Sequence, residues 1–234
     1  MRSVLRADPA RILSLRVAVA RDDQRVGEIL QLAQAAGIQV QRAQPREFAQ
    51  WLGEDTAHQG VLAEVRPLLA WDENQLLESL TLASNPLVLV LDGVQDPHNL
   101  GACLRTANAC GALAVLVPKD RAVQLNATVR KVAAGAAEFT PVVSVTNLAR
   151  SLRLLKDAGL WIVGADAEAP KRVSEVDLKS SVALVMGAEG SGLRQLTRDT
   201  CDLLVALPMI GQVESLNVSV AAGMLLYEAR RQRT

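Results

Sequence analysis

The sequence predicts an α/β protein whose larger part is a mostly parallel sheet with helices on both faces. Three observations support this expectation. Across residues 84–234, short apolar runs alternate with segments that have the apolar spacing of helices. The runs are apolar throughout, which is typical of strands buried on both faces of a parallel sheet. Half of the 234 residues are hydrophobic, which is enough for a substantial core.

A smaller α/β unit is expected at residues 1–66. Residues 23–36 have the apolar spacing of a helix, and Gly37 suits its end. The sequence His58-Gln59-Gly60 could contact a ligand, although an ordinary turn is favoured because turns are built from such residues. The strands expected in this unit are residues 13–20, 38–40 and 60–65, and its helices are residues 23–36 and 45–52.

A linker is expected at residues 67–83, where Pro67 cannot continue a strand ladder and residues 72–74 are polar. Residues 75–82 are expected to add a short helix to it. A second alternation of strands and helices starts at Pro86. Its expected strands are residues 87–91, 113–117, 142–145, 161–165, 182–186 and 203–207. Its expected helices are residues 99–110, 122–134, 148–158, 193–199 and 217–231.

The composition narrows the classes of function. The formal net charge is zero, so no global positive field indicates a nucleic-acid binder. The C-terminal RRQR at residues 230–233 suits a local RNA contact or a solvated helix end equally well. Aromatic residues make up only 3% of the chain, which disfavours a binder that stacks many bases on aromatic side chains.

The three cysteines, Cys103, Cys110 and Cys201, form no C-x-x-C pair, so a structural zinc site is not expected. Cys103 and Cys110 lie on the apolar side of an expected helix, which indicates buried thiols in a reducing compartment. The N-terminus shows no long apolar core with a cleavage pattern, and no run reaches membrane-spanning length. We therefore expect a soluble, cytoplasmic protein.

Three stretches carry the candidate chemistry, and each passes from an apolar strand through a polar loop into a helix. In the first, residues 92–111, Asn99 follows Pro97 and is a candidate helix cap. Arg105 lies roughly opposite the apolar stripe of the same helix, near the positive end of the helix dipole. A bound phosphate would suit its guanidinium, but a solvated surface arginine explains Arg105 equally well.

The second stretch, residues 184–193, contains the sequence GAEGSG at residues 187–192. Its order differs from the G-x-G-x-x-G of dinucleotide-binding folds, and it lacks the lysine of a phosphate-binding P-loop. Three glycines allow a ligand to approach the backbone closely. Glu189 would repel a polyphosphate and suits a cationic or hydroxyl-bearing ligand, although a tight turn with an exposed glutamate is an equally good explanation.

The third stretch, residues 207–223, begins with an apolar lip that includes Met209 and Ile210. Ser215 lies at the expected start of the last helix, and simple capping is its favoured explanation. Asn217 follows among apolar residues. An amide at an apolar helix start needs a specific partner, so Asn217 is the residue that capping by Ser215 leaves unexplained.

Together the three stretches resemble motifs 1, 2 and 3 of the SpoU/TrmH family of RNA ribose 2′-O-methyltransferases, which have the knotted SPOUT fold. The matching patterns are N-L-G-A-x-x-R-x-A, M-G-x-E-G-x-G, and L-P-M followed by S-L-N-V-S-V-A, in the family's order across residues 84–234. The match is closest to members that methylate a guanosine ribose in the P loop of bacterial large-subunit ribosomal RNA (23S rRNA). Residues 1–66 resemble the small RNA-binding domain of those members, which is similar to ribosomal protein L30e.

This resemblance implies a trefoil knot in residues 84–234, S-adenosylmethionine as cofactor, and a homodimer with the site at the interface of the knotted domains. The implied cofactor contacts are Gly187, Leu207, Met209, Ile210 and Leu216. The implied catalytic or substrate-positioning residues are Asn99, Arg105, Glu189, Ser215 and Asn217. The last helix, apolar at Val220, Met224 and Leu225, suits a dimer interface or a core helix equally.

The implied reaction moves a methyl group from a sulfonium sulfur to a ribose 2′-oxygen, whose hydroxyl must be deprotonated or strongly oriented. A guanidinium stays protonated in proteins. Our hypothesis is therefore that Arg105 holds the substrate phosphate and polarises the hydroxyl, while Ser215 and Asn217 orient it. Glu189 is expected to position Asn99 or Arg105. No metal is required.

Other functions stay open. The same motifs serve enzymes that methylate transfer RNA or other ribosomal sites, and a non-catalytic RNA-binding or ribosome-assembly factor could retain the fold. The presence of all five motif residues argues against the non-catalytic alternative. A dinucleotide-dependent enzyme is disfavoured, because the first strand–loop–helix lacks the glycine fingerprint and its acidic partner.

The chain departs from the family pattern at two places. Members usually carry a G-x-H-x-V segment ahead of the part that matches residues 2–5, and Met1 stands here without it. The small domain is therefore expected to lack its first strand or helical turn, or the true start lies upstream. Glu214 stands where some relatives have a small polar residue, and its charge beside an RNA site is unexplained.

Overall fold

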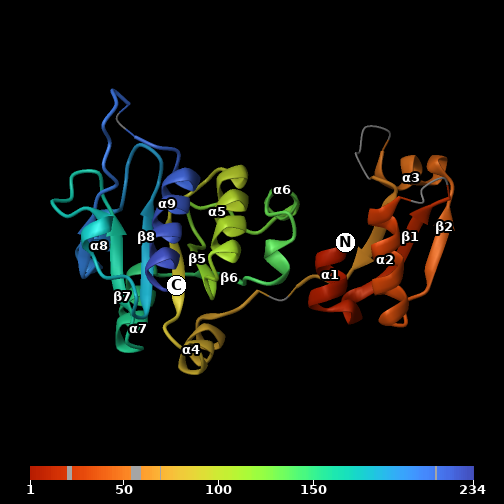
Figure 1. Ribbon diagram of the computed structural model, residues 1–234, viewed down its shortest axis with the longest axis horizontal. Coiled ribbons are helices and arrows are strands. Elements are labelled where there is room, and N and C mark those ends of the chain that lie inside the picture. The colour runs from red at the N-terminus through yellow and green to blue at the C-terminus, as the bar shows by residue number, and fades with distance from the viewer. Residues whose placement is uncertain (20–22, 54–58, 69, 214) are drawn as a thin grey trace. The chain divides into compact units, whose positions relative to one another are not determined.

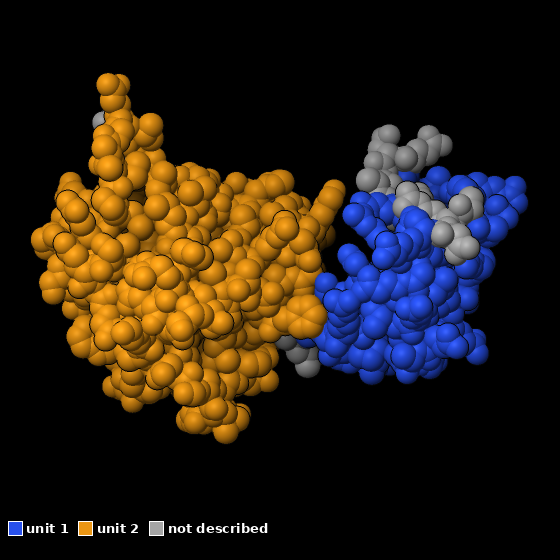
Figure 2. Space-filling model, viewed as in Figure 1, with its two compact units in different colours: residues 1–69 blue, residues 70–234 orange. Residues whose placement is uncertain are grey.

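The protein is described by a computed structural model that covers residues 1–19, 23–53, 59–68, 70–213 and 215–234. It consists of two compact units, Met1–Leu69 and Ala70–Thr234, which Figure 2 shows in different colours.

The first unit is a three-stranded sheet with the strand order β2-β1-β3, flanked by helices (Figure 1). The central strand pairs in parallel with β2 and antiparallel with β3. One face is covered by α1 and α2 and the other by α3, with separate apolar clusters between sheet and helix. In chain order the elements are α1 (Arg2–Ala7), a short 3-10 turn (Pro9–Arg11), β1 (Ile12–Ala18), α2 (Gln24–Ala35), β2 (Val40–Ala43), α3 (Pro45–Leu52) and β3 (Val61–Val65).

Most of the elements expected in the first unit are present, and α1 is the one that the sequence did not predict. Its Leu5 is buried in the apolar cluster of Leu15 and Ile29, and Arg2 and Arg6 both form ion pairs with Glu28 of α2. Helix α1 thus depends on contacts with a distant helix. The second strand lies later than expected, because its pairing with β1 begins at residue 40.

The turn before β3 has left-handed backbone, with φ of +49° at Gln59 and +73° at Gly60. The expectation of an ordinary turn at this point therefore agrees with the structure for Gln59 and Gly60. His58, like Ala20 at the end of the expected first strand, lies outside the described residues.

The second unit is a six-stranded sheet in which every neighbouring pair is parallel, with the strand order β6-β5-β4-β8-β7-β9. The predicted mostly parallel sheet of residues 84–234 is confirmed. Its strands are β4 (Leu87–Asp92), β5 (Ala114–Pro118), β6 (Val142–Val145), β7 (Trp161–Ala165), β8 (Val182–Gly187) and β9 (Leu203–Val205).

Helices cover both faces of this sheet, and alternate residues of each strand face opposite layers. Leu89, Leu91 and Leu184 face the layer of α5 and α9. Val88, Val90 and Ala183 face the layer of α4 and α7. The elements of the two layers are α4 (Glu73–Leu82), α5 (Pro97–Ala109), α6 (Ala127–Val132), α7 (Leu148–Asp157), α8 (Gln195–Thr200) and α9 (Val218–Gln232), with 3-10 turns at Ala136–Glu138 and Val173–Glu175.

The helix expected at residues 122–134 is shorter than predicted. The Asn126 side chain accepts a hydrogen bond from the Val129 amide at 2.9 Å and so caps α6. Before it, the Gln124 side chain donates to the carbonyl of Pro118 at 2.9 Å and holds the segment as a loop. After it, Ala134 and Gly135 have φ of +52° and +97°, which end the helix.

The cysteines lie partly as expected. Cys103 is buried, and its burial raises the pKa of the thiol to about 12. The expectation that Cys110 is also buried is wrong, because it is the C-cap of α5 and only half-buried. Burial still raises the pKa of Cys110, although the charge of Arg230 lowers it.

Candidate active site

The order of the strands places the three sequence stretches at one edge of the sheet. From β4 the chain runs to β5 and β6 on one side, whereas β8 continues to β9 on the other. Adjacent strands whose connections run in opposite directions leave a crevice outside their carboxyl ends, where α/β proteins bind ligands. Asp92 and Gly187, the last residues of β4 and β8, are paired directly across this point.

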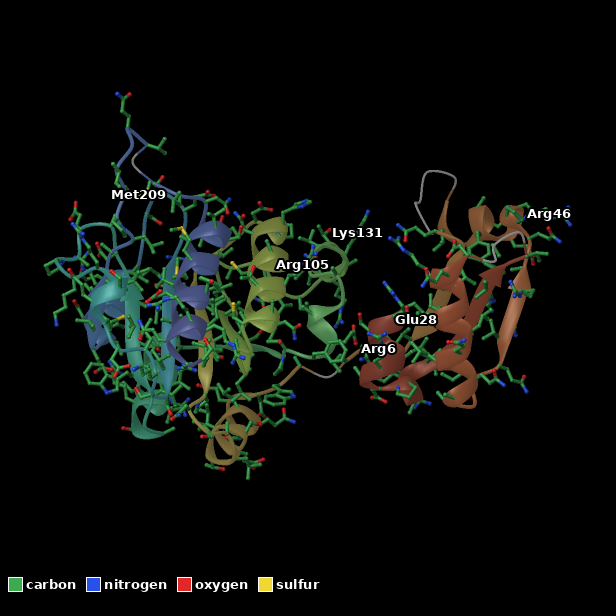
Figure 3. The ribbon with its side chains drawn as sticks, viewed as in Figure 1. Arg6, Glu28, Arg46, Arg105, Lys131 and Met209 are labelled. Carbon is green, nitrogen blue, oxygen red and sulfur yellow. The ribbon has the colours of Figure 1, made fainter. Side chains whose placement is uncertain are left out.

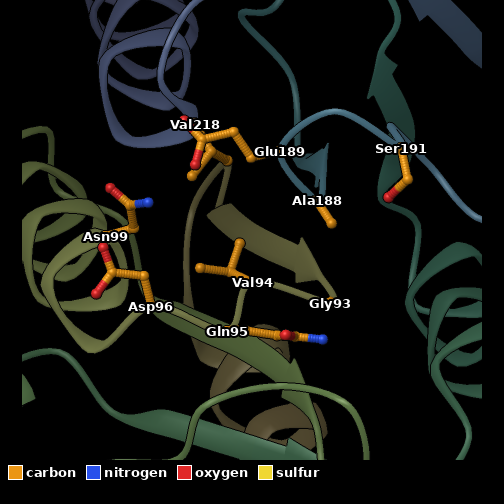
Figure 4. Close-up of a pocket in the computed structure, with 9 residues that line it drawn as sticks. All are labelled: Gly93, Val94, Gln95, Asp96, Asn99, Ala188, Glu189, Ser191 and Val218. Atoms are coloured by element: carbon orange, nitrogen blue, oxygen red, sulfur yellow. The ribbon is translucent and has the colours of Figure 1, made fainter.

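A pocket of about 320 Å³ opens at this crevice, as Figure 4 shows. It is formed by the loop after β4, the loop after β8 and the start of α9, so all three sequence stretches contribute to it. Asn99 and Glu189 are the two predicted site residues among those that line it. Its lining consists of Gly93, Val94, Gln95, Asp96, Asn99, Ala188, Glu189, Ser191 and Val218.

The Asn217 side chain joins the three stretches. Its Nδ2 donates to Oδ1 of Asn99 at 2.9 Å and to Oε1 of Glu189 at 3.4 Å. Its Oδ1 accepts from the amide of Ser219 at 2.9 Å and from the Ser219 hydroxyl at 2.6 Å. The Asn217 amide therefore caps α9 and binds both other stretches. Asn99 and Glu189 are the specific partners that an amide at an apolar helix start requires.

Two capping expectations are wrong. Asn217, and not Ser215, is the N-cap of α9. Asp96, and not Asn99, is the N-cap of α5, where its side chain accepts from the amide of His98 at 2.9 Å. Asn99 lies inside the first turn of α5 with only 8% of its surface exposed, so its side chain is free to meet Asn217 across the crevice.

Arg105 does not line the pocket. It is six residues beyond Asn99 on α5, which places the two side chains about 120° apart around the helix. Arg105, which is labelled in Figure 3, is exposed and forms no ion pair with any residue that the structure describes. The expectation that Glu189 positions Asn99 or Arg105 needs correction, because the residue that Glu189 contacts is Asn217.

The glycines of the second stretch are explained by the loop itself. A side chain at Gly187 would place its Cβ 2.1 Å from the carbonyl carbon of Gly192. Gly190 and Gly192 have φ of +79° and +65°, conformations that favour glycine. Ala188 and Gly192 exchange two backbone hydrogen bonds, at 3.0 and 2.9 Å. The loop is therefore a tight hairpin-like turn that presents Glu189 beside Asn217.

This loop is anchored by an ion pair that the sequence analysis missed. The Asp92 carboxylate is fully buried, and Oδ2 accepts from the Arg194 amide at 3.0 Å. Oδ1 accepts from Nε of Arg194 at 2.5 Å and also pairs with its Nη2. An aspartate that ends the otherwise apolar run LVLVLD was the available signal, because a buried charge requires a partner.

A second, smaller pocket of about 150 Å³ lies beside the loop after β9. It contains three of the five expected cofactor-contact residues and one expected catalytic residue, Ser215. Gly187 does not line it, and Ile210 is fully exposed outside it. Its lining consists of Ala165, Asp166, Ala167, Val205, Leu207, Met209, Ser215, Leu216 and Ala221.

The chemistry of this smaller pocket fits a cofactor with apolar surface. Its walls are mainly aliphatic, and one carboxylate, Asp166, forms an ion pair with Arg198 at 2.5 Å. Next to it, the loop exposes three large apolar side chains, those of Met209, Ile210 and Val213. Contiguous exposed apolar side chains mark binding sites, and S-adenosylmethionine would cover such a surface.

Across the ranges that the structure describes, no three or more His, Cys, Asp or Glu side chains come together in a way that could hold a metal ion. Within the same ranges no helix is long and apolar enough to span a membrane. Glu214 lies outside the described residues, so its charge stays unexplained.

The RRQR segment at the C-terminus is largely used inside the fold. Arg231 forms an ion pair with Glu228 at 2.7 Å, which, together with Gln232, lowers the pKa of that carboxyl to about 2. Arg233 donates to the carbonyls of Leu178 at 2.8 Å and Asn85 at 2.9 Å. Arg230 alone of the three arginines has no hydrogen bond or ion pair from its side chain within the described chain, so the segment is mainly structural.

Both units match the sequence profiles of known protein families. The sequence profile of the SpoU rRNA methylase family matches residues 86–227. A second profile, described as RNA 2′-O ribose methyltransferase substrate binding, matches residues 2–71. A protein of Pseudomonas aeruginosa, named 23S rRNA (guanosine-2′-O-)-methyltransferase RlmB, is 54% identical over 233 residues, which cover 99% of this chain and 93% of that protein.

Solved methyltransferase structures align with the fold of this chain over nearly its whole length. The crystal structure of an RNA 2′-O ribose methyltransferase aligns with a TM-score of 0.74 at 28% identity, over 99% of this chain and 86% of that chain. The SpoU methyltransferase AviRb from Streptomyces viridochromogenes, crystallised with the cofactor AdoMet, aligns with a TM-score of 0.79 at 23% identity, over 99% and 87% of the two chains.

Removing the side chain of Arg194 should lower the free energy of unfolding more than removing that of Asp92. Arg194→Ala leaves a buried carboxylate without its counter-ion, so we expect a loss of about 3 kcal/mol in the free energy of unfolding. Asp92→Ala leaves an arginine side chain that is 46% exposed and can turn to water, so a smaller loss of about 1–2 kcal/mol is expected. Urea unfolding of both variants measures the difference.

The double variant Asp92→Ala with Arg194→Ala serves as the control, because it removes both charges together. It should be no less stable than Arg194→Ala alone. A double variant that lost the sum of the two single losses would show that the two side chains do not interact.

Proposed function

The chain belongs to the SpoU rRNA methylase family, and we propose that it methylates the ribose 2′-hydroxyl of a guanosine in the P loop of 23S rRNA, with S-adenosylmethionine as methyl donor. Membership is shown by the family profile over residues 86–227 and confirms the resemblance found in the sequence. The Pseudomonas aeruginosa relative named for this reaction supports the substrate at 54% identity. The observation that carries the proposal is the Asn217 amide, which holds the three sequence stretches together.

We propose that the smaller pocket holds the cofactor. When bound there, S-adenosylmethionine supplies a methyl group on a positively charged sulfur. Leu207, Met209 and Leu216 contribute apolar surface from the pocket wall. Gly187 and Ile210 are assigned to the same cofactor on the family resemblance, although neither lines the pocket in this chain. Burial of Met209 and Ile210 under a ligand would remove apolar surface from water, which is favourable.

We propose that the larger pocket receives the ribose to be methylated. Asn217 holds Asn99 and Glu189 in place, and its own Oδ1 is occupied by Ser219. The carboxylate of Glu189 reaches Asn217 through Oε1. Its other oxygen is therefore available to accept a hydrogen bond from the ribose hydroxyl, which orients that hydroxyl for loss of its proton. Ser215 lines the smaller pocket, two residues before Asn217, and is proposed to orient the same hydroxyl.

The two units are proposed to divide the work. Residues 1–66 act as the RNA substrate-binding domain with an L30e-like fold, and residues 84–234 are the catalytic domain. Residues 67–83 connect them and include α4, which packs on the sheet of the second unit. The substrate-binding profile over residues 2–71 supports the first assignment. The trefoil knot of the catalytic domain stays a prediction. A ribosomal RNA substrate implies that the protein works in the cytoplasm.

We further propose that the protein acts as a homodimer. Helix α9 exposes an apolar stripe of Val220, Met224 and Tyr227, spaced three to four residues apart on one helix face. Leu225, expected on the same stripe, is instead buried in the core. Arg105 lies outside the pocket of its own chain, so a second copy packed on the α9 stripe could bring its Arg105 to this site.

The proposed role of Asn217 predicts that Asn217→Ala loses methylation activity but still binds the cofactor. Purified protein with tritiated S-adenosylmethionine should label 23S rRNA in the P loop and leave transfer RNA unlabelled. Asn217→Ala should reduce this labelling about a hundredfold or more, since catalytic groups that lose their positioning cost several kcal/mol in the transition state. Calorimetry should still detect cofactor binding in the variant.

Asn108→Ala is a matched control, because Asn108 donates to Thr140 at 2.9 Å within the same unit but away from both pockets. It should retain activity. Labelling of transfer RNA alone would overturn the proposed substrate, and cofactor binding without labelling of either RNA would favour a non-catalytic assembly factor.

The proposed phosphate contact predicts that Arg105→Lys weakens RNA binding. Lysine keeps the charge but lacks the planar fork that binds phosphate through two parallel hydrogen bonds. The KM for RNA should rise about tenfold. Arg153 is an exposed arginine of α7 on the opposite face of the sheet. Arg153→Lys should leave the KM for RNA unchanged. Unchanged turnover and RNA affinity in Arg105→Lys would refute the role given to the guanidinium.

The dimer proposal predicts that a charge on the α9 stripe separates the subunits. Met224→Glu should sediment as a monomer at micromolar concentration, because it places a carboxylate in an apolar interface. Leu196→Glu alters a similarly exposed apolar side chain on α8 and should leave the dimer intact. The proposal fails if the natural chain is a monomer or if Met224→Glu remains a dimer.

A further inference from the structure

One face of the sheet in the first unit is only partly covered. Helix α3 packs on this face through Phe48, which is buried against Ala18 and Ala43. The register of the strands places polar residues on the rest of the same face, because Ser14 is paired with Glu64, and Arg16 with Gln41. We call the residues Ser14, Arg16, Gln41, Trp51 and Glu64 the open sheet face.

A tryptophan stands at the edge of this open sheet face. Trp51 of α3 is 46% exposed, although the neighbouring Phe48 fills the core. The Arg16 guanidinium carbon lies 4.7 Å from the centroid of the Trp51 ring. The Phe48 ring meets Trp51 edge-on, with centroids 6.0 Å apart and an angle of 62° between the planes. The ring is thus held firmly while almost half of its surface stays open.

The guanidinium on the ring is fixed in turn by the sheet. Nη1 of Arg16 donates to the Ser14 hydroxyl at 3.1 Å, and the Ser14 hydroxyl donates to the Glu64 carboxylate at 3.5 Å. A stacked arginine and tryptophan held by such contacts need little further ordering when a ligand binds, which favours affinity.

The composition of the unit points to a nucleic acid as that ligand. All nine basic residues within residues 1–69 are arginine, whereas the five lysines of the chain begin at residue 119. Arginine stacks on planar rings and binds phosphate through two hydrogen bonds, and lysine does neither as well. The chain has only six aromatic residues, and one of them is held exposed on this unit beside a guanidinium.

We propose that the open sheet face binds an unpaired nucleotide of the substrate RNA. Its base stacks on the Trp51–Arg16 pair, as bases stack on aromatic side chains and guanidinium planes in RNA-binding proteins. Gln41 and Glu64 offer hydrogen-bonding groups to the base edge. This inference rests on the proposed function, whose RNA substrate the profile over residues 2–71 also supports.

Tryptophan fluorescence gives a readout specific to this site. Titration of the full chain with a 23S rRNA fragment that contains the P loop should quench part of the emission, because a stacked base quenches indole. Trp51→Leu should abolish the quenching and weaken RNA binding about tenfold, which corresponds to the loss of one stacked base. Trp51→Phe should restore most of the affinity.

Trp161→Leu is the matched control, since Trp161 is 57% exposed on β7 of the other unit. It should bind RNA with unchanged affinity and keep the quenching. A duplex RNA of equal length should not quench, because its bases are stacked within the helix. If circular dichroism shows that Trp51→Leu does not fold, Arg16→Gln tests the proposal instead. The same loss of RNA affinity is expected for it.

The proposal is overturned if Trp51→Leu or Arg16→Gln binds the RNA fragment as tightly as the natural chain, or if the quenching persists without Trp51. Methylation kinetics separate this inference from the proposed function. Trp51→Leu should raise the KM for RNA and leave kcat unchanged. Quenching by RNA in a chain that methylates nothing would sink the proposed function and leave the stacking site standing.

Discussion

The hydrogen bonds of the Asn217 amide are the constraint on which the site depends. Its two polar atoms have different tasks, since Oδ1 caps α9 while Nδ2 binds Asn99 and Glu189. An ionised carboxylate at this position could not serve both tasks, because it only accepts hydrogen bonds, whereas an amide carries an acceptor and a donor on the same carbon. The start of α9, the first turn of α5 and the loop after β8 are therefore fixed relative to one another by one residue, and the larger pocket takes its form from that arrangement.

The parallel sheet supplies the second constraint, which is the proximity of segments far apart in sequence. Strands β4 and β8 are neighbours although paired residues such as Leu87 and Val182 are 95 positions apart in the sequence, and the carboxyl ends of the two strands meet at the same edge. A buried carboxylate at that edge is costly unless it is paired. Asp92 is paired with the side chain and the amide of Arg194, so the pair closes the Glu189 loop from its far end. Sheet topology thus positions the loops, and polar contacts made only in the folded chain fix their shapes.

The sequence was sufficient for features that depend on local pattern and insufficient for those that depend on distant partners. All six strands of the larger unit could be predicted because their apolar runs are continuous, and the glycine loop and Glu189 could be predicted as a turn. Helix α1 could not, because it is held by Glu28 and Leu15 from elsewhere in the chain. Asn99 was expected to cap its helix because capping is a local pattern, whereas its actual partner lies 118 residues away. Glu189 was expected to position Asn99 or Arg105, and the periodicity of α5 separates Arg105 from the pocket.

The loop after β9 also links the proposed cofactor pocket to the proposed catalytic residues. Leu207, Met209 and Leu216 belong to a loop that exposes apolar side chains to water, an arrangement whose free energy falls when a ligand covers them. Leu216 is followed directly by Asn217. A ligand that fixes the position of Leu216 therefore limits the positions open to the Asn217 amide, and through it those of Asn99 and Glu189. A cofactor bound in the smaller pocket, as proposed, would therefore also restrict the larger pocket, because Leu216 and Asn217 are joined by one peptide bond.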